Sequence, residues 1–185
     1  TGRSRVGWVG CGRRPALRRC PGGEKMARIN QVLQLVGQLN YVWTNTESLF
    51  IYLIAYLAGT SKEVAIVIFL TLNTTRARLD LLERLARVGS TQEPTREAVL
   101  GIIDRLKRES RVRNKYNHCI YSFDAQGEMS GTQLMRIAEI NNDLKYGKSE
   151  SLDENEMDRI RLAIENITVV NREIWEFMAT SHIDM

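Results

Sequence analysis

Apolar residues recur every three or four positions through residues 28–58, and this spacing constrains the fold more than any other feature of the chain. The stripe consists of Val32, Leu35, Val36, Leu39, Trp43, Phe50, Leu53, Ile54 and Leu57. Such spacing places the side chains on one face of an α-helix. We therefore expect one long first helix over 28–58. Gly59 would end it, because glycine readily adopts the left-handed conformation that closes helices.

Three further segments have helical patterns of their own. The stretch "TSKE" (Thr60 to Glu63) has the spacing of a capping box, so a second helix is expected from there to about residue 88, before Gly89. Pro94 marks the start of a third helix through "EAVLGIIDRLKRESRVRNKYNH". The stretch "SLDE" (Ser151 to Glu154) has capping-box spacing again and predicts the start of a fourth helix.

The segment between the third and fourth helices, "CIYSFDAQGEMSGTQLMRI", is rich in residues that favour strands and contains Gly127. We read it as a short β-hairpin. The predicted fold is therefore mainly α, a four-helix up-down bundle with a short β-hairpin between helices three and four. The apolar runs "LFIYLIAYLA" and "VAIVIFLTL" are too short for a bilayer, which needs about 20 continuous apolar residues, so they predict a buried helical hairpin rather than membrane spans.

The first 25 residues differ in character from the rest. The chain of 185 residues is long enough for one well-buried domain, and its net charge of +4 is unevenly placed. Residues 1–25 are rich in Arg and Gly and have no helical or strand period, whereas residues 26–185 are slightly acidic. We expect 1–25 to be a disordered basic leader outside the native domain, with Met26 as the biological start and 26–185 as the folded unit. The alternative is a native basic tail that touches phosphates.

Cysteine usage and motifs limit the chemistry. Cys11 and Cys20 lie in the leader, so Cys119 is the only cysteine of 26–185. A single thiol without a secretory signal indicates a reducing cytoplasm. One relevant histidine and one cysteine cannot build a zinc site, and no phosphate-binding loop or Ser/His/Asp arrangement appears, so we expect no metal and no other cofactor.

The third predicted helix changes from apolar to polar towards its end. Its apolar face is formed by Val99, Ile102, Ile103 and Leu106. Continued at 100° per residue, that face reaches Arg113 and Asn117, with Asn114 and His118 in a second row beside it. A basic row consisting of Lys107, Arg111 and Lys115 lies next to His118. Burying an Arg and an amide is costly unless they find partners or an anion, so this end is expected to border a cleft or a second subunit.

Each of these residues also has an ordinary structural interpretation. Arg113 could pair with a carboxylate of another helix, such as Glu47. His118 could be a helix-end histidine favoured by the negative end of the helix dipole. The basic row could be a solvated face.

The sequence Arg113-Asn114-x-x-x-His118, late in the third helix of a predicted four-helix bundle, resembles the signature of the HEPN family (higher eukaryotes and prokaryotes nucleotide-binding domains). That signature is an Arg, then Asn, Asp or His, then three residues and a His. The stretch "NYVWTNTESLFIYLIAYLAGT" is also similar to bacterial members, and the resemblance covers residues 26 to 180. Many members are metal-independent RNases that act as homodimers, often as toxins or defence effectors, whereas others are non-catalytic binding or scaffolding domains.

The resemblance implies that Arg113, Asn114 and His118 are catalytic. Cleavage of RNA through its own 2′-OH requires a base, stabilisation of negative charge on the phosphorane, and an acid for the leaving oxygen. His118 would be the base, Arg113 would bind phosphate oxygens, and Asn114 would orient either of them. The acid is unassigned within one chain, because His182 is remote in sequence, but a second subunit could supply a second His118.

Substrate-binding residues are expected around this motif, namely Lys107, Arg111, Asn117 and Tyr121. Tyr121 and Asp124 could stack on a base or hold His118, or they could simply belong to a hairpin packed on the bundle. Polar residues that interrupt the apolar stripes could line the cleft or be satisfied core residues: Thr46, Arg78 and Asn171.

Two functions remain open from the sequence. One is a dimeric RNase, and the other is a HEPN-like interaction or nucleotide-binding module. A cognate antitoxin, for example a small nucleotidyltransferase, would be a suitable partner for either.

Overall fold

The computed structural model describes residues 21–140 and 143–183, and within them the side chains of 28–137 and 143–183. The described chain is mainly helical with a small antiparallel sheet, which confirms that part of the predicted fold. In chain order the elements are α1 (Pro21–Ser48), α2 (Phe50–Ala58), α3 (Lys62–Thr71), α4 (Thr75–Ala86), α5 (Glu93–Asn117), β1 (Cys119–Phe123), β2 (Met129–Leu134), β3 (Ile137–Ile140), β4 (Asp143–Tyr146), β5 (Ser149–Ser151) and α6 (Glu154–Thr180).

The two long helices expected before residue 89 are each divided into two. The first is divided at Leu49, and Gly59 then closes α2 with a left-handed φ of 59°, as the sequence predicts. The second is divided after Leu72, whose backbone is extended, and the hydroxyl of Thr74 accepts a hydrogen bond from Ala77 N at 3.1 Å to start α4. A capping threonine stabilises a new helix start instead of continuing the old helix, which is why the predicted single helix is wrong here.

Two helix starts are capped by residues next to those expected. Ser61, and not Thr60, is the N-cap of α3, and its hydroxyl accepts from Val64 N. Asp153, and not Ser151, is the N-cap of α6, where its carboxylate accepts from Glu156 N at 2.9 Å. A carboxylate at this position also complements the positive end of the helix dipole.

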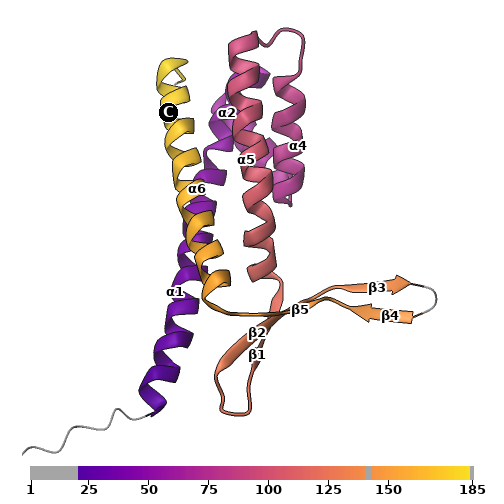
Figure 1. Cartoon of the computed structure of the whole chain (residues 1–185). Coiled ribbons are helices and arrows are strands. Elements are labelled where there is room, and N and C mark those ends of the chain that lie inside the picture. Colours follow the sequence, from indigo (N-terminus) through magenta and orange to yellow (C-terminus); the bar gives the residue numbers. More distant parts are fainter. Residues whose placement is uncertain (1–20, 141–142, 184–185) are drawn as a thin grey trace, which may run out of the picture.

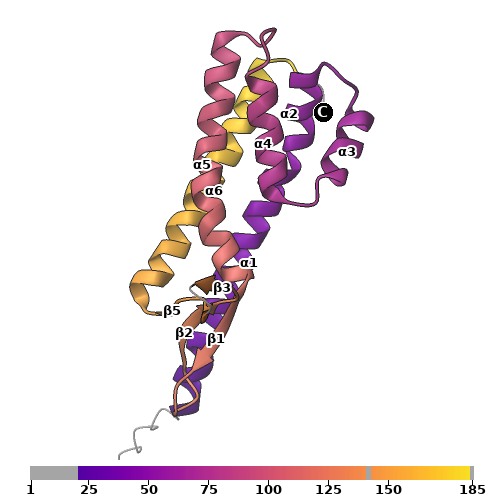
Figure 2. The ribbon, with the colours of Figure 1, turned by 90° about the vertical axis from the view of Figure 1, so that its right-hand side faces the viewer.

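The helices pack along one another around a single apolar core. α6 lies along α1 and α5, α4 lies against α5 and α2, and α3 packs on α2 (Figure 1, Figure 2). The largest fully buried side chains of this core include Trp43, Phe50, Leu82, Leu106 and Ile160. They come from α1, α2, α4, α5 and α6, so the stripes read from the sequence do face a shared interior.

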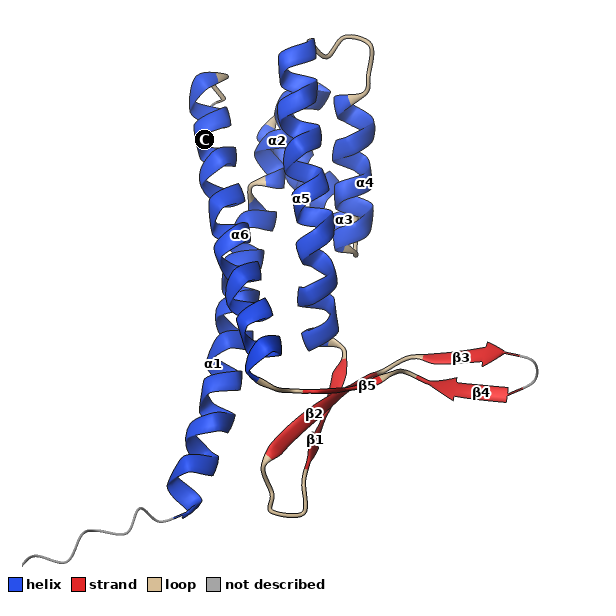
Figure 3. Ribbon diagram, viewed as in Figure 1, coloured by secondary structure: helices blue, strands red, loops and turns tan. Residues whose placement is uncertain are grey.

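The strand content is larger than one short hairpin. β1 and β2 pair antiparallel and β5 joins the other edge of β2, whereas β3 and β4 form a separate two-stranded ribbon (Figure 3). Gly131 lies in β2 where this strand pairs with both β1 and β5. A glycine is needed there, because a Cβ would lie 2.9 Å from Ser122 Oγ and 3.0 Å from Glu150 O. The three-stranded sheet follows the C-terminal end of α5 through β1 and leads into α6 through β5.

α1 begins at Pro21, inside the segment expected to be a leader. Residues 1–20 lie outside the described residues, so the prediction about them stays a prediction. Within residues 21–140 and 143–183, no helix combines the length and the apolar character that crossing a bilayer would require.

Candidate functional site

The C-terminal end of α5 meets α1 and the root of the sheet, and this is where the predicted site residues lie. The apolar face of α5 ends at Leu106, and in the last two turns the buried position passes to Tyr116, which is 3% exposed. Asn117 is the last helical residue and His118 is the C-cap. The chain then enters β1, so the polar end of α5 is joined directly to the sheet.

Arg113 is half-buried and bound by neutral amides. Its Nη1 donates to Asn114 Oδ1 at 3.1 Å. With the Asn117 amide oriented so that its oxygen faces the guanidinium, that oxygen accepts from Arg113 Nε at 2.9 Å and Nη2 at 3.3 Å. The Asn117 nitrogen then donates to Asn40 of α1 at 2.9 Å. The structure therefore brings Arg113, Asn114 and Asn117 together, and adds Asn40.

Trp43 of α1 lies beneath this cluster. The guanidinium carbon of Arg113 is 5.9 Å from the centre of the indole ring, within cation–π range. Trp43 is only 1% exposed, and its Nε1 finds no hydrogen-bond acceptor among the described residues. An unsatisfied buried N–H costs stability, so Trp43 holds its place through packing and its contact with Arg113.

Arg113 differs from the other partly buried cations of α5 in having no carboxylate partner within the described residues. Arg105 pairs with Glu173, and Lys115 pairs with Glu150 and Glu156. Lys107 pairs with Glu83 at 2.5 Å. No acidic side chain of the described residues forms an ion pair with Arg113, and an unpaired cation of this kind is suited to binding an anion.

His118 is exposed and fixed through its backbone. Its N donates to Asn114 O at 3.1 Å, and its O accepts from Met135 N at 2.9 Å. Its imidazole makes no hydrogen bond or ion pair with any side chain that the structure describes. Five residues along an ideal helix turn the chain by about 140°, so the position of His118 lies on a different side of α5 from Arg113 and nearer to Asn114. As the C-cap, with φ −130° and ψ 35°, His118 has itself left the helical conformation.

The expected basic row does not form a free cationic surface. Lys107 is bound to α4 through Glu83, and Lys115 is bound to β5 and α6, while Arg111 is exposed and unpaired in the described part of the chain. Only Arg111 of the three is therefore available to a nucleic acid without breaking an ion pair.

Lys115 and Glu156 form the centre of a partly buried polar cluster. Glu156 Oε1 also accepts from Tyr116 Oη at 2.8 Å, and its Oε2 lies 2.9 Å from Arg159 Nη1. Burial by itself raises the pKa of Glu156, but the hydrogen bonds from Lys115 and Tyr116 outweigh it, so the net pKa is lowered. Burial lowers the pKa of Lys115, but its two carboxylate partners, Glu150 and Glu156, raise it by more than burial lowers it, so the net pKa is raised. The cluster ties the end of α5 to α6.

Tyr121 and Asp124 have structural partners. Tyr121 lies beside Cys119 on one face of β1, and burial, followed by the interaction with Cys119, raises its pKa. Burial likewise raises the pKa of the Cys119 thiol. Asp124 Oδ1 accepts from Gln126 N and Glu128 N in the β1–β2 turn, so Asp124 does not hold His118.

The polar residues that interrupt the apolar stripes are satisfied within the core. Asn171 Nδ2 donates to Thr46 Oγ1 at 3.1 Å, and Thr46 Oγ1 donates to Val42 O at 2.8 Å. Arg78 pairs with Glu47, so Glu47 is not the partner of Arg113. The core interpretation of these residues accounts for all of their contacts, and none of those contacts involves Arg113 or His118.

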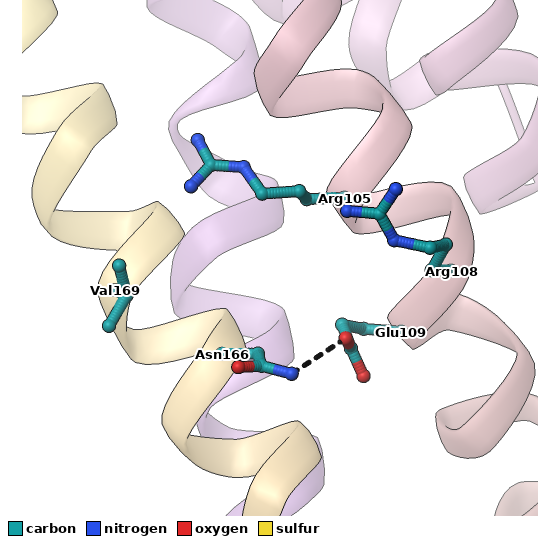
Figure 4. A pocket seen from close by; sticks show the side chains of 5 residues that line it. All are labelled: Arg105, Arg108, Glu109, Asn166 and Val169. Atoms are coloured by element: carbon teal, nitrogen blue, oxygen red, sulfur yellow. Dashed lines mark hydrogen bonds between the residues drawn. The ribbon is translucent and has the colours of Figure 1, made fainter.

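Two shallow depressions lie away from the motif. One is lined by Arg105, Arg108 and Glu109 of α5 with Asn166 and Val169 of α6, where Asn166 Nδ2 donates to Glu109 Oε1 at 2.9 Å (Figure 4). The other lies where α1 meets the β1–β2 turn and the start of α6. Neither includes a residue of the Arg113 cluster.

Asn40 and Trp43 are the site residues that sequence reasoning missed. Trp43 belongs to the apolar stripe of the first helix and is buried, as that pattern predicts, and Asn40 lies three residues before it on α1. An asparagine at the edge of an apolar stripe is the only sequence signal for this contact, and it does not reveal which helix faces it.

Comparison with protein-family models, with curated proteins and with solved structures finds no match. We therefore infer the function from the geometry of the site and from the resemblance in the Arg113-to-His118 motif.

Proposed function

We propose that the chain is a HEPN-like endoribonuclease that binds RNA at the end of α5 and cleaves it without a metal ion. The observation that carries the proposal is the state of Arg113, a half-buried cation held by two amides, those of Asn114 and Asn117, and by no carboxylate in the described chain. A phosphate would supply the missing negative charge. The HEPN-like four-helix bundle, and a role as a toxin or defence effector with a cognate antitoxin, belong to the same proposal.

The proposed steps use the exposed imidazole and the guanidinium. His118 takes the proton of the RNA 2′-OH, whose oxygen attacks the adjacent phosphorus. Arg113 stabilises the negative charge that develops on the phosphorane oxygens. Asn114, hydrogen-bonded to Arg113 and one turn before His118, orients the two groups relative to each other.

A second copy of the chain completes the proposed site. The bond to the leaving 5′ oxygen breaks as that oxygen receives a proton, and one His118 per chain cannot act as base and acid in the same step. Two α5 ends in a homodimer would provide two His118 and two Arg113. Arg111, exposed and unpaired in the described chain, would contact RNA phosphates beside this cleft.

A second candidate is a non-catalytic module that binds RNA or nucleotides. Two observations favour this candidate. Arg113 and His118 lie at positions on different sides of α5, and the guanidinium of Arg113 is hydrogen-bonded to amides. Both are more typical of a cation that binds a ligand than of two groups that react together. In this case Arg113 and Arg111 bind phosphate, and His118 has no chemical role.

The deciding experiment is cleavage of a mixed set of end-labelled RNAs by the full chain in EDTA, compared with His118→Ala. His182→Ala is the matched control, because His182 is the other histidine of the chain. We expect wild type and His182→Ala to cleave RNA but not its 2′-deoxy counterpart, and His118→Ala to lose about 10² to 10⁴ in rate. Equal cleavage by a folded His118→Ala protein would disprove the mechanism. RNA binding without cleavage by any variant would identify the binding module.

A further inference from the structure

The β3–β4 ribbon, hereafter the arm (Ile137–Ile140 and Asp143–Tyr146), stands away from the helices. Its strands pair only with each other in the described structure, with Ile137 opposite Tyr146 and Glu139 opposite Leu144. Figure 1 shows the arm projecting sideways from the end of the bundle, beyond the three-stranded sheet. A two-stranded ribbon without further packing is marginally stable in water, so the arm needs a partner.

One face of the arm carries three exposed apolar side chains. Residues opposite each other in an antiparallel pair share a face, and so do residues two apart, so Ile137, Leu144 and Tyr146 lie on the same side, which also includes the position of Glu139 opposite Leu144. Their exposed fractions are 67%, 61% and 70%. Three neighbouring large apolar side chains that are this exposed are typical of an interaction surface.

Among the described residues no strand pairs with the outer edge of β4, and β4 carries two opposite charges. Asp143 and Lys145 lie on the face opposite Leu144, both are exposed, and neither forms an ion pair with a described residue. Unpaired strand edges readily accept another strand, and soluble proteins usually protect them.

We propose that a second copy of this chain pairs with β4 edge to edge, antiparallel, about a two-fold axis through Leu144. This register sets Leu144 opposite Leu144 of the second copy and Asp143 opposite Lys145 of the second copy. Both ends of the contact then form an attractive cross-strand pair. The faces that carry Leu144 and Tyr146 fall on the same side of a four-stranded sheet, with β4 and its copy at the centre.

The neighbouring registers are less favourable. An axis through Lys145 sets two Lys145 side chains opposite each other, and an axis through Asp143 does the same for two carboxylates. An axis midway between Leu144 and Lys145 would set these two residues opposite each other although they point to opposite faces of the strand, so a regular antiparallel ladder cannot form there. The composition of β4 therefore selects one self-complementary register.

The arm is connected to the proposed catalytic region but does not depend on its chemistry. Met135, just before β3, donates its N–H to His118 O at 2.9 Å, so each arm is rooted at the end of an α5. Arm pairing would tether two α5 ends in one assembly. It does not by itself place two His118 side chains on one phosphate, so it can hold whether or not the chain cleaves RNA.

The test is the association of the full chain and two charge variants, measured by analytical ultracentrifugation over about 1 to 100 µM. Asp143→Lys sets Lys opposite Lys145, and Lys145→Asp sets Asp opposite Asp143, so each variant alone should dimerise at least about tenfold more weakly than wild type. An equimolar mixture of the two restores opposite charges at both positions, so it should form a heterodimer of near wild-type affinity.

The mixture separates loss of pairing from loss of folding, because a misfolded variant would not regain affinity when mixed. Glu97→Lys, an exposed charge change in the second turn of α5, is the control and should dimerise like wild type. A wild type that remains monomeric at 100 µM, or a mixture no more dimeric than its components, would overturn the proposal. A monomer that cleaves RNA would refute the arm contact and the two-chain site but not the RNase activity. A dimer that pairs through the arm but does not cleave RNA would support the arm contact and refute the RNase proposal.

Discussion

Arg78 of α4 holds Glu47 of α1, with Arg78 Nη1 3.3 Å from Glu47 Oε1 and side chains that are 17% and 10% exposed. Thr75 Oγ1 donates to the same carboxylate oxygen at 2.7 Å, and Arg78 also lies over the Phe69 ring at 3.9 Å. From the sequence, Glu47 was a possible ion-pair partner of Arg113. Because Glu47 pairs with Arg78 instead, the described contacts of Arg113 are with amides, and the proposed anion site is based on this.

Replacing Arg78 should destabilise the fold strongly. In Arg78→Met the carboxylate of Glu47 stays nearly buried without its cation, which typically costs about 3 kcal/mol in the free energy of unfolding. Arg76→Met is the control, because Arg76 pairs with Asp80 at the surface with a side chain that is 91% exposed. A surface pair of this kind is worth about 0 to 1 kcal/mol. Urea unfolding would measure the free energy of unfolding of both variants. Equal losses of free energy would mean that the Arg78–Glu47 pair contributes no more than a surface ion pair.

The Lys115–Glu156 pair should make stability depend on pH. The pKa of Glu156 is lowered from 4.5 in the folded protein, so its pairing stabilises the fold above pH 4.5 and is lost as pH falls through the folded pKa. The pKa of Lys115 is raised from 10.5, so its contribution is complete below pH 10.5 and is lost as pH rises through the folded pKa. The pair therefore stabilises the fold fully between those limits.

Lys115→Met tests this dependence. Near pH 7 the variant leaves Glu156 buried without its main cation and should lose about 3 kcal/mol in the free energy of unfolding. Below pH 4.5 Glu156 is protonated more readily in the variant, since burial then raises its pKa, so the gap between wild type and variant should narrow. Thermal unfolding between pH 3 and 8 would measure the gap. A gap that stayed constant with pH would show that Lys115 acts by packing alone.

Local patterns in the sequence predicted the mainly helical fold, the left-handed turn at Gly59 and the apolar faces, because all of these depend on residues close in the chain. The breaks at Leu49 and after Leu72 were missed, since a capping Thr74 competes with a continuous apolar stripe and only tertiary packing decides between them. The shared face of Arg113 and Asn117 could be read from their spacing on one helix, but the contact of Asn117 with Asn40 could not be predicted, because it requires knowing which face of α1 meets α5. The partners of Lys107 and Lys115 were missed for the same reason.

Trp43 should tolerate loss of its N–H but not loss of its ring. Trp43→Phe removes a buried donor that has no acceptor in the described chain, which offsets part of the volume lost, so we expect a change in the free energy of unfolding of about 1 kcal/mol or less. Trp43→Ala leaves a cavity beneath Arg113 and should cost about 3 to 5 kcal/mol. Chemical denaturation distinguishes the two. A loss of several kcal/mol in Trp43→Phe would indicate that Nε1 has a hydrogen-bond partner in solution.

The composite site predicts how wild-type activity falls when inactive chains are mixed in. If each cleft requires His118 from two chains, only dimers of two wild-type chains cleave RNA. An equimolar mixture of wild type and His118→Ala, co-refolded so that chains exchange at random, would keep about one quarter of the activity of the same total concentration of wild type. If each chain carries a complete site, about half would remain, in proportion to the wild-type chains. Mixing wild type with His182→Ala controls for refolding and should leave activity unchanged. A linear decline in activity with the fraction of His118→Ala would refute the two-chain site, while still assigning the base to His118.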